Sequence, residues 1–332
     1  MMLPLLEERI FSIGGVTLAG RDVVAAARRW GDWARLEEEV RRGLACAEHA
    51  DDTGDDVAED DLETAAQEFR YERDLISGQD MQAWLDRWSL DAADWMEYLR
   101  RRLLRERWGA EVAAIAAEHP VEPEDVEEVL HAEAVCSGFL ERLARKLAGR
   151  ASAAARARDE GWIGAEPSGD GLGPALERID AGFRSFCDHV VTPAALAAQV
   201  AAHRLEWVRA HCRCLALPTI EGAREAALCV REDGMDLDEV ARSAGATAEV
   251  AHAFLDGYDD TLRDALLAAR PGDLLGPIVS GDRFVVILVH DKVLPSLDDP
   301  VVRRRAQERL LDSALAREVH DRVEWHRPDL AR

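Results

Sequence analysis

The residues best suited to chemistry lie in one short segment, His211-Cys212-Arg213-Cys214. Imidazole and thiolate groups are ordinary zinc ligands, so this segment raises the question of a metal site. On a strand, Cys212 and Cys214 share one face while His211 points to the other, so only two ligands converge. No second pair of Cys or His at metal-ligand spacing lies nearby in the sequence. We therefore expect no metal ion and no other cofactor, and we interpret the two cysteines as buried structural thiols.

A second pair, Cys187 and His189, has the residue types of a thiol nucleophile and its general base. Residues two apart on a helix do not face each other, however, so this spacing does not favour a catalytic dyad. The chain also shows no glycine-rich phosphate loop with a Walker lysine before a helix. The sequence thus gives no positive signal for these two enzyme classes.

Tryptophan is the other conspicuous residue type, with nine copies in the chain. Trp84 and Trp88 are four residues apart on a predicted helix, and Trp95 opens the next helix, so the spacing predicts an aromatic cluster. Two interpretations stay open. The cluster is either ordinary helical core or a groove in which exposed aromatic side chains bind a peptide.

Composition narrows the function classes further. The 332 residues include 65 acidic and 41 basic side chains, a net charge of −24 at pH 7, which disfavours nucleic acid and anionic membrane surfaces as partners. With 48% apolar residues the chain is globular, and no apolar run is long enough to span a bilayer. The opening MMLPLLEERI lacks the basic flank of a secretion signal, and the six cysteines are spread widely. We expect a cytoplasmic protein.

The first half of the chain is predicted to be mainly helical. A strand at 10–13 and a Gly14-Gly15 turn precede a helix that Thr17 is expected to cap. Ser77 is expected to cap the helix that carries Trp84, and the acidic run from 51 to 56 to form a solvated loop. Further helices are expected at residues 33–49, 60–70 and 95–104, and from 124 to beyond 150. Glycines and prolines across 157–174 predict a linker or mobile loop, after which one helix is expected from about residue 175 and Thr192 is expected to cap another.

After Trp207 the pattern changes to a mixture of strands and helices. The predicted order is β-α-α-α-β, a compact α+β module. Its elements are expected at residues 208–217, 220–231, 237–243, 261–269 and 284–289. A connector at 294–300 then leads to one long amphipathic helix, expected at 301–325.

The segment from Ala268 to Ser280 resembles the parvulin family of peptidyl-prolyl isomerases, in which a helix exit at Pro-Gly-Glu leads to a strand with Gly-Pro. The strand that carries His211 resembles the family's first strand. The resemblance implies an apolar slot with His211 at its floor, for which the candidate lining residues are Phe254, Tyr258, Leu262 and Phe284. Their alternative interpretation is ordinary core.

The polar residues of the parvulin active site are not all matched. Val285 stands where the resemblance implies a second histidine, and residues 243–247 offer no Asp or Cys. The family's Gly-Gly-Asp-Leu-Gly loop is also missing before Thr261. We therefore expect that isomerase catalysis is lost.

The first half, with Phe69-Arg70-Tyr71-Glu72-Arg73 and Trp84-Leu85, resembles the amino-terminal region of SurA-like chaperones. It also resembles peptide-maturation proteins of ribosomal natural-product clusters. This resemblance implies a helical domain at 1–206, a parvulin-like domain at 207–293, and a connector with a final helix at 294–332 that packs back on the first domain.

These observations predict a mainly α protein with an α+β parvulin-like module and a SurA-like helical domain completed by a C-terminal helix. The hypothesis for function is non-catalytic binding of a precursor or unfolded peptide, at His211 and the slot residues and at Trp84, Trp88 and Trp95. Tailoring enzymes and a second copy of the chain are the further partners it includes. An active prolyl isomerase and a general holdase chaperone are the alternatives.

Overall fold

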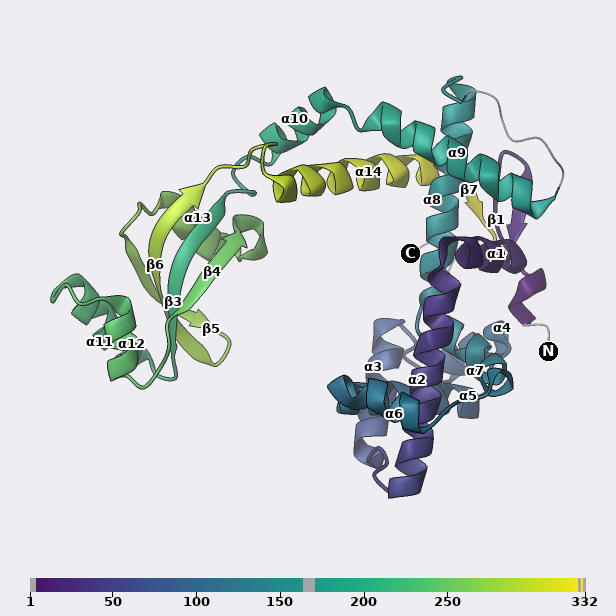
Figure 1. The fold of residues 1–332 in the computed structure, drawn as a ribbon, viewed down its shortest axis with the longest axis horizontal. Coiled ribbons are helices and arrows are strands. Elements are labelled where there is room, and N and C mark those ends of the chain that lie inside the picture. The colour runs from purple at the N-terminus through teal and green to yellow at the C-terminus, as the bar shows by residue number, and fades with distance from the viewer. Residues whose placement is uncertain (1–3, 164–170, 328–329, 331–332) are drawn as a thin grey trace. The chain divides into compact units, whose positions relative to one another are not determined.

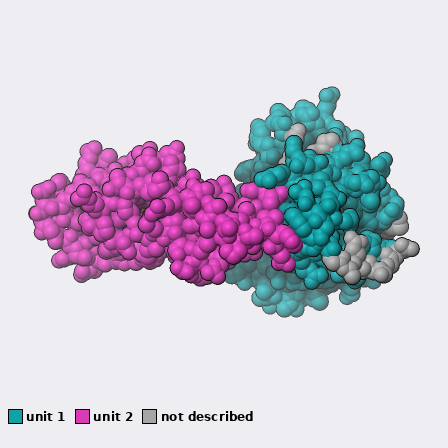
Figure 2. Space-filling model, turned by 90° about the horizontal axis from the view of Figure 1, so that it is seen from above, with its two compact units in different colours: residues 1–186, 315–332 teal, residues 187–314 magenta. Residues whose placement is uncertain are grey.

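The computed structural model describes residues 4–163, 171–327 and 330. The chain forms two compact units (Figure 2). Unit 1 comprises Met1–Phe186 and Leu315–Arg332, and unit 2 comprises Cys187–Ala314, so unit 2 is inserted into the sequence of unit 1. The fold is mainly helical with two small antiparallel sheets, which confirms the predicted fold class. Among the described residues, no helix combines the length and the apolar composition that crossing a membrane requires.

Unit 1 is built from helices (Figure 1), most of which share one large apolar core, while α6 packs with α2 and α5 in a second, smaller cluster. Trp33, Leu36, Leu99 and Leu147 lie in this core and are almost completely buried. Short 3-10 turns at Pro4–Glu7 and Gly109–Glu111 accompany the α-helices. The α-helices are α1 (Gly20–Trp30), α2 (Asp32–Thr53), α3 (Glu59–Glu72), α4 (Gly78–Trp88), α5 (Ala92–Trp108), α6 (Val112–Glu118), α7 (Pro123–Cys136), α8 (Phe139–Asp159) and α9 (Leu172–Val190).

A three-stranded antiparallel sheet joins sequence-distant parts of unit 1. In spatial order its strands are β2 (Val16–Ala19), β1 (Arg9–Ile13) and β7 (Val323–Trp325). The first two form a hairpin, and β7 pairs with the other edge of β1. The two ends of the sequence are therefore linked by backbone hydrogen bonds.

The predicted helix cap at Thr17 is wrong, because Thr17 belongs to β2. Its hydroxyl lies 2.9 Å from that of Ser12 on the neighbouring strand. Helix α1 begins three residues later, at Gly20, where the carboxylate of Asp22 accepts the backbone N–H of Ala19 at 2.7 Å. The apolar and polar residues at 16–18 alternate, as in a strand of a hairpin. The prediction was wrong because it considered Thr17 only as a helix cap.

The predicted helix 301–325 is shorter than expected. Helix α14 (Pro300–Arg322) begins in unit 2 and ends in unit 1, and its last three predicted residues form β7 instead. Trp325 packs on Phe11 of β1, with ring centres 5.4 Å apart. Helix α14 ends where residues 323–325 pair with β1, which lies far away in the sequence. The periodicity of a single segment does not show such pairing.

Two other boundaries in unit 1 also differ from the predictions. The helix expected from 124 to beyond 150 is two helices, α7 and α8, separated at Gly138, which adopts a positive φ of 68°. The loop expected at 157–174 is smaller than predicted, because α8 continues to Asp159 and α9 begins at Leu172. Residues 164–170 of that loop lie outside the described residues.

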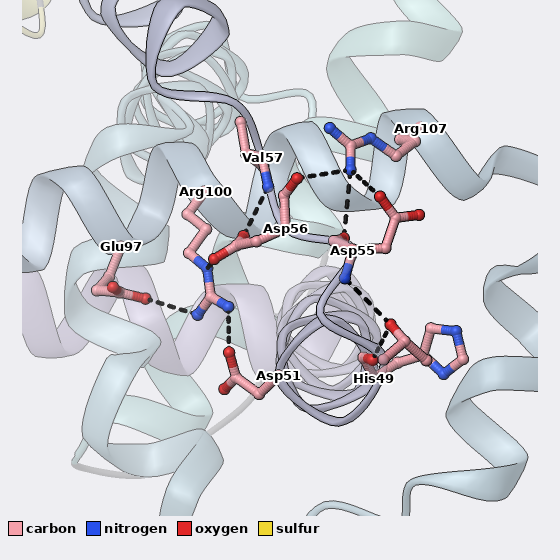
Figure 3. A network of polar contacts seen from close by, with 9 residues as sticks. His49, Asp51, Asp55, Asp56, Val57, Glu97, Arg100 and Arg107 are labelled. Carbon is pink, nitrogen blue, oxygen red and sulfur yellow. Dashed lines mark hydrogen bonds and ion pairs between the residues drawn. The ribbon is translucent and has the colours of Figure 1, made fainter.

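The acidic run from Asp51 to Asp56 is exposed to solvent, as predicted, and two arginines of α5 pair with it (Figure 3). Arg100 donates hydrogen bonds to Asp51 at 2.5 Å and to Asp56 at 2.9 Å. Arg107, two turns further along α5, donates to the side chain of Asp55 at 3.2 Å. The prediction of a solvated acidic loop is confirmed for residues 54–56, whereas residues 51–53 are the last turn of α2. The sequence did not show that two arginines from a distant segment neutralise the carboxylates.

Unit 2 contains a four-stranded antiparallel sheet in the order β4-β3-β6-β5. The predicted order β-α-α-α-β lacks two of these strands, β4 and β5, which lie at the edges of the sheet. The strands are β3 (Arg209–Leu217), β4 (Glu249–Phe254), β5 (Leu274–Ser280) and β6 (Arg283–Val293). The helices of this unit are α10 (Pro193–Ala202), α11 (Ile220–Arg231), α12 (Leu237–Ser243) and α13 (Asp260–Ala268), with a 3-10 turn at Leu255–Gly257.

The two faces of the unit 2 sheet carry separate apolar clusters. Leu215 and Val286 pack with α11 and α12, whereas Cys212 and Val289 pack with Leu266 of α13. Since Val286 and Val289 point to opposite faces of β6, α11 and α12 cover one face and α13 covers the other. The helices predicted at 220–231 and 237–243, and the cap at Thr192, are confirmed.

Candidate functional site

A groove of about 480 Å³ opens on unit 1 beside helix α4. The end of α3, helix α4, the end of α7 and the start of α8 form its walls. Its apolar lining consists of Leu75, Ala83, Trp84, Trp88, Val135, Leu140 and Leu330. A cavity of this size suits a few side chains of a peptide or one small molecule.

The turn between α3 and α4 sets one side of this groove. Helix α3 ends at Glu72, and Asp74 adopts a positive φ of 58°, a conformation that Asp tolerates better than most residues. The backbone N–H of Leu75 donates to the carbonyl of Arg70 at 2.8 Å. The guanidinium of Arg70 in turn donates to the carbonyls of Leu75 and Ile76. These bonds fix a tight turn and place Leu75 in the groove.

Helix α4 presents the tryptophans. Ser77 caps it, as predicted: its hydroxyl accepts the N–H of Asp80 at 3.1 Å, and the Asp80 carboxylate accepts the N–H of Ser77. Trp84 and Trp88 follow one turn apart and both line the groove. Trp84 is partly exposed and packs edge-on against Phe69, with ring centres 5.5 Å apart.

The structure does not bring Trp95 into the groove. Trp95 is buried in the core behind α4, 5.6 Å from Phe69 between ring centres. Trp88 and Trp95 both belong to the buried core and Trp84 packs against it, but only Trp84 and Trp88 also line the groove. Their role in binding stays a prediction.

Carboxylates outnumber guanidinium groups among the residues that line the groove. Arg73 donates to the backbone carbonyl of Cys136 at 2.6 Å and lies over the ring of Phe69, 3.8 Å from its centre, while burial lowers the pKa of Arg73. The other charged lining residues are Glu72, Asp74, Asp80, Arg87 and Glu141. Four carboxylates against two guanidinium groups favour a ligand that carries positive charge beside its apolar groups.

In unit 2, the structure places a histidine pair that the sequence analysis missed. His211 on β3 lies opposite His252 on β4, with ring centres 4.4 Å apart and ring planes at 88°. Val285, which stands where the resemblance implies a second histidine, belongs to an apolar cluster instead. Residues 249–254 read EVAHAF and do not alternate between polar and apolar, so the sequence pattern gave no clear signal for this strand or for the pairing of His252 with His211.

The four slot candidates do not form one cluster. Tyr258 and Leu262 pack on the face that α13 covers, and Phe284 packs with α11 and α12 on the other face. Phe254 packs with Trp207, and the guanidinium of Arg305 lies 4.6 Å from the centre of its ring. The structure thus does not bring together these four residues and His211, and their role in peptide binding stays a prediction.

The described residues contain no group of three or more His, Cys, Asp or Glu side chains arranged to hold a metal ion. The cysteines of β3 are poor candidates on chemical grounds. Burial raises the pKa of Cys212 to about 11 and raises that of Cys214 as well. Both are therefore protonated thiols at neutral pH, whereas zinc binds thiolates.

No family model and no curated protein matches this sequence. Solved structures similar to it are foldases and SurA-like chaperones, all at low identity. The foldase PrsA of Lactococcus lactis is 8% identical over 98% of this chain and 97% of its own, with a TM-score of 0.32. PrsA of Streptococcus pneumoniae is 9% identical over 94% and 93%, with a TM-score of 0.29. A SurA-like chaperone of Campylobacter jejuni is 12% identical over 74% and 90%, with a TM-score of 0.24.

Proposed function

We propose that this protein is a chaperone-like peptide-binding protein that holds an extended peptide segment in the groove beside α4. The observation that carries this proposal is the cavity of about 480 Å³ with Trp84 and Trp88 in its wall. Tryptophan offers a large, rigid apolar surface and loses little conformational entropy on binding, so it is frequent at the centre of peptide interfaces. Trp84 is partly exposed and so has surface that a ligand would bury.

The charge of the groove suggests the kind of peptide. Its excess of carboxylates, together with the net charge of −24, would attract basic or neutral segments and repel acidic ones. The resemblance to peptide-maturation proteins suggests a ribosomally made precursor peptide, held for tailoring enzymes in the cytoplasm. A general holdase would use the same groove for unrelated unfolded chains.

Calorimetry with a panel of short labelled peptides tests this proposal. The panel pairs apolar residues with basic or with acidic neighbours. We expect Trp84→Ala to weaken binding of the basic peptides by about 10- to 100-fold, as for the loss of an aromatic anchor. Trp108→Ala is the matched control, because Trp108 packs against His49 and does not line the groove. Equal affinity of Trp84→Ala and the parent protein for every peptide would contradict the proposal.

Adding reduced, unfolded proteins to the same panel distinguishes a binder of one precursor peptide from a general holdase. A precursor-specific protein would bind a few peptides and ignore unrelated unfolded chains. A holdase would bind most of them with similar affinity and suppress their aggregation.

A prolyl isomerase is the second candidate function. The histidine pair on β3 and β4 favours it, because parvulins use facing histidines beside the prolyl ring. The dispersal of the slot candidates over both faces of the sheet favours binding without catalysis.

A further inference from the structure

The segment that follows β7 runs along the edge of β1 toward the groove. The backbone N–H of His326 donates to the carbonyl of Ile10 at 2.9 Å. One residue further, Arg327 forms an ion pair with Glu8, and its guanidinium lies over the ring of Trp88, 3.8 Å from the ring centre. A basic side chain of the protein itself therefore occupies one face of a groove tryptophan.

Leu330 completes this contact. Its side chain is 2% exposed and lines the groove together with Trp84 and Trp88. Its backbone N–H donates to the carbonyl of Arg327 at 3.0 Å, which holds the two residues close to each other. A basic residue therefore lies over Trp88, and an aliphatic residue three positions later lines the groove with both tryptophans.

Leu330 and its neighbour Arg327 are anchored differently from the rest of the groove. Apart from Leu330, every described lining residue lies on α3, α4, α7 or α8, or in the short turn between α3 and α4. Arg327 and Leu330 instead follow β7, a strand of only three residues. Moving them out of the groove would break no helix.

We propose that Arg327 and Leu330 are an internal occupant of the groove, which a client peptide displaces by presenting the same chemistry. This inference rests on the proposed function and specifies it. The client is a segment with a basic residue three positions before an aliphatic one. Its basic group replaces Arg327 over Trp88, and its aliphatic side chain takes the place of Leu330.

Affinity measurements on three leucine variants test the displacement. Leu330→Ser removes the occupant, and we expect it to tighten binding of an Arg-x-x-Leu peptide about tenfold. Leu140→Ala removes part of the fixed wall on α8 and is expected to weaken binding. Leu104→Ala, in a different apolar cluster of unit 1, controls for a general loss of stability and is expected to leave affinity unchanged. Tightening by Leu104→Ala to the same extent would overturn the inference.

The peptide itself offers a second control. Replacing its Arg by Glu and its Leu by Ser is expected to abolish binding to both the parent protein and Leu330→Ser. Binding of the substituted peptide at parent affinity would overturn the assigned ligand class.

Hydrogen exchange distinguishes displacement from a merely structural role of Leu330. Addition of the Arg-x-x-Leu peptide is expected to speed exchange at the amides of His326 and Leu330 while it protects the turn at Leu75. Protection of all three amides would overturn displacement, because the segment would then stay in place beside the ligand.

The two proposals fail in different ways. If the parent protein binds the peptide and Leu330→Ser binds it equally well, only the internal occupant is disproved. If neither protein binds any peptide of the panel, the proposed function is disproved as well.

Discussion

His211 on β3 and His252 on β4 face each other across the unit 2 sheet, with imidazole ring centres 4.4 Å apart. Asp291 on β6 is the register partner of His211 on its other side. Three ionisable side chains thus follow one another across three adjacent strands.

We expect this pair to be insufficient for isomerase catalysis. In exchange NMR on X-Pro peptides, the parent protein, His211→Ala and His252→Ala are all expected to leave the cis–trans rate within about twofold of the free peptide, because the slot residues are not gathered around the pair. Acceleration by the parent protein that is lost in both variants, and kept in the control His290→Ala, would establish the isomerase instead.

The local features of the fold could be predicted from the sequence. The helices at 220–231 and 237–243 have the predicted bounds, and the capped start of α4 at Ser77 was correctly located. Each of these depends on residues within one turn or one helix. Caps, turns and helical periodicity depend on residues that are close in the sequence, so they can be predicted from the sequence alone.

Pairing between distant segments could not be predicted in the same way. Strand β7 has only three residues, and its partner β1 lies at the other end of the sequence. The histidine pair and the ion pairs of Arg100 depend likewise on segments that the fold brings together. The groove was predicted in part, since Trp84 and Trp88 share a helix, whereas the placement of Trp95 behind them depends on how α5 packs.

The acidic loop after α2 is expected to make the stability of unit 1 depend on pH. The hydrogen bond from Arg100 lowers the pKa of Asp56 below its ordinary value of 3.8. A lowered folded-state pKa adds stability above the unfolded-state pKa, and this stability is lost as the pH falls through the folded-state pKa. Asp56→Asn is therefore expected to destabilise the protein at pH 7 and to have little effect near pH 2.

The expected effect of Asp56→Asn at pH 7 is small, about 0.5–1 kcal/mol, because half of the Asp56 side chain is exposed and solvent screens the pair. Urea denaturation at both pH values measures it. Glu63→Gln, at an exposed position of α3, is the matched control. An equal loss for Asp56→Asn at pH 2 and pH 7 would show that the charge of Asp56 is not the cause.

The packing of α9 on α8 is expected to depend on a single glycine. A Cβ added at Gly182 would lie 2.6 Å from the Cβ of Ala154, closer than real Cβ contacts, so Gly182→Ala would push the helices apart. We expect a loss of about 1–3 kcal/mol in the free energy of unfolding, typical of overpacking.

Gly173→Ala in the same helix is the matched control. A Cβ there has open space around it, so helix propensity is expected to make this change neutral or stabilising by up to about 1 kcal/mol. The unfolding temperatures of Gly182→Ala, Gly173→Ala and the parent protein measure both effects. If both variants unfold at the same temperature as the parent protein, the close approach at Ala154 does not constrain the helices.

The pairing of β1 with β7 also has a consequence for synthesis. A ribosome adds about 5–20 residues per second, so roughly 300 residues between the two strands take on the order of 15–60 s to translate. During that interval Ile10 and Phe11 of β1, which are fully buried in the finished protein, have only β2 beside them and lack their second partner strand, β7. Unit 2 is translated entirely within this interval, so it is able to complete its own sheet while unit 1 still waits for its last strand. The nascent chain would itself need protection at the hairpin until translation ends.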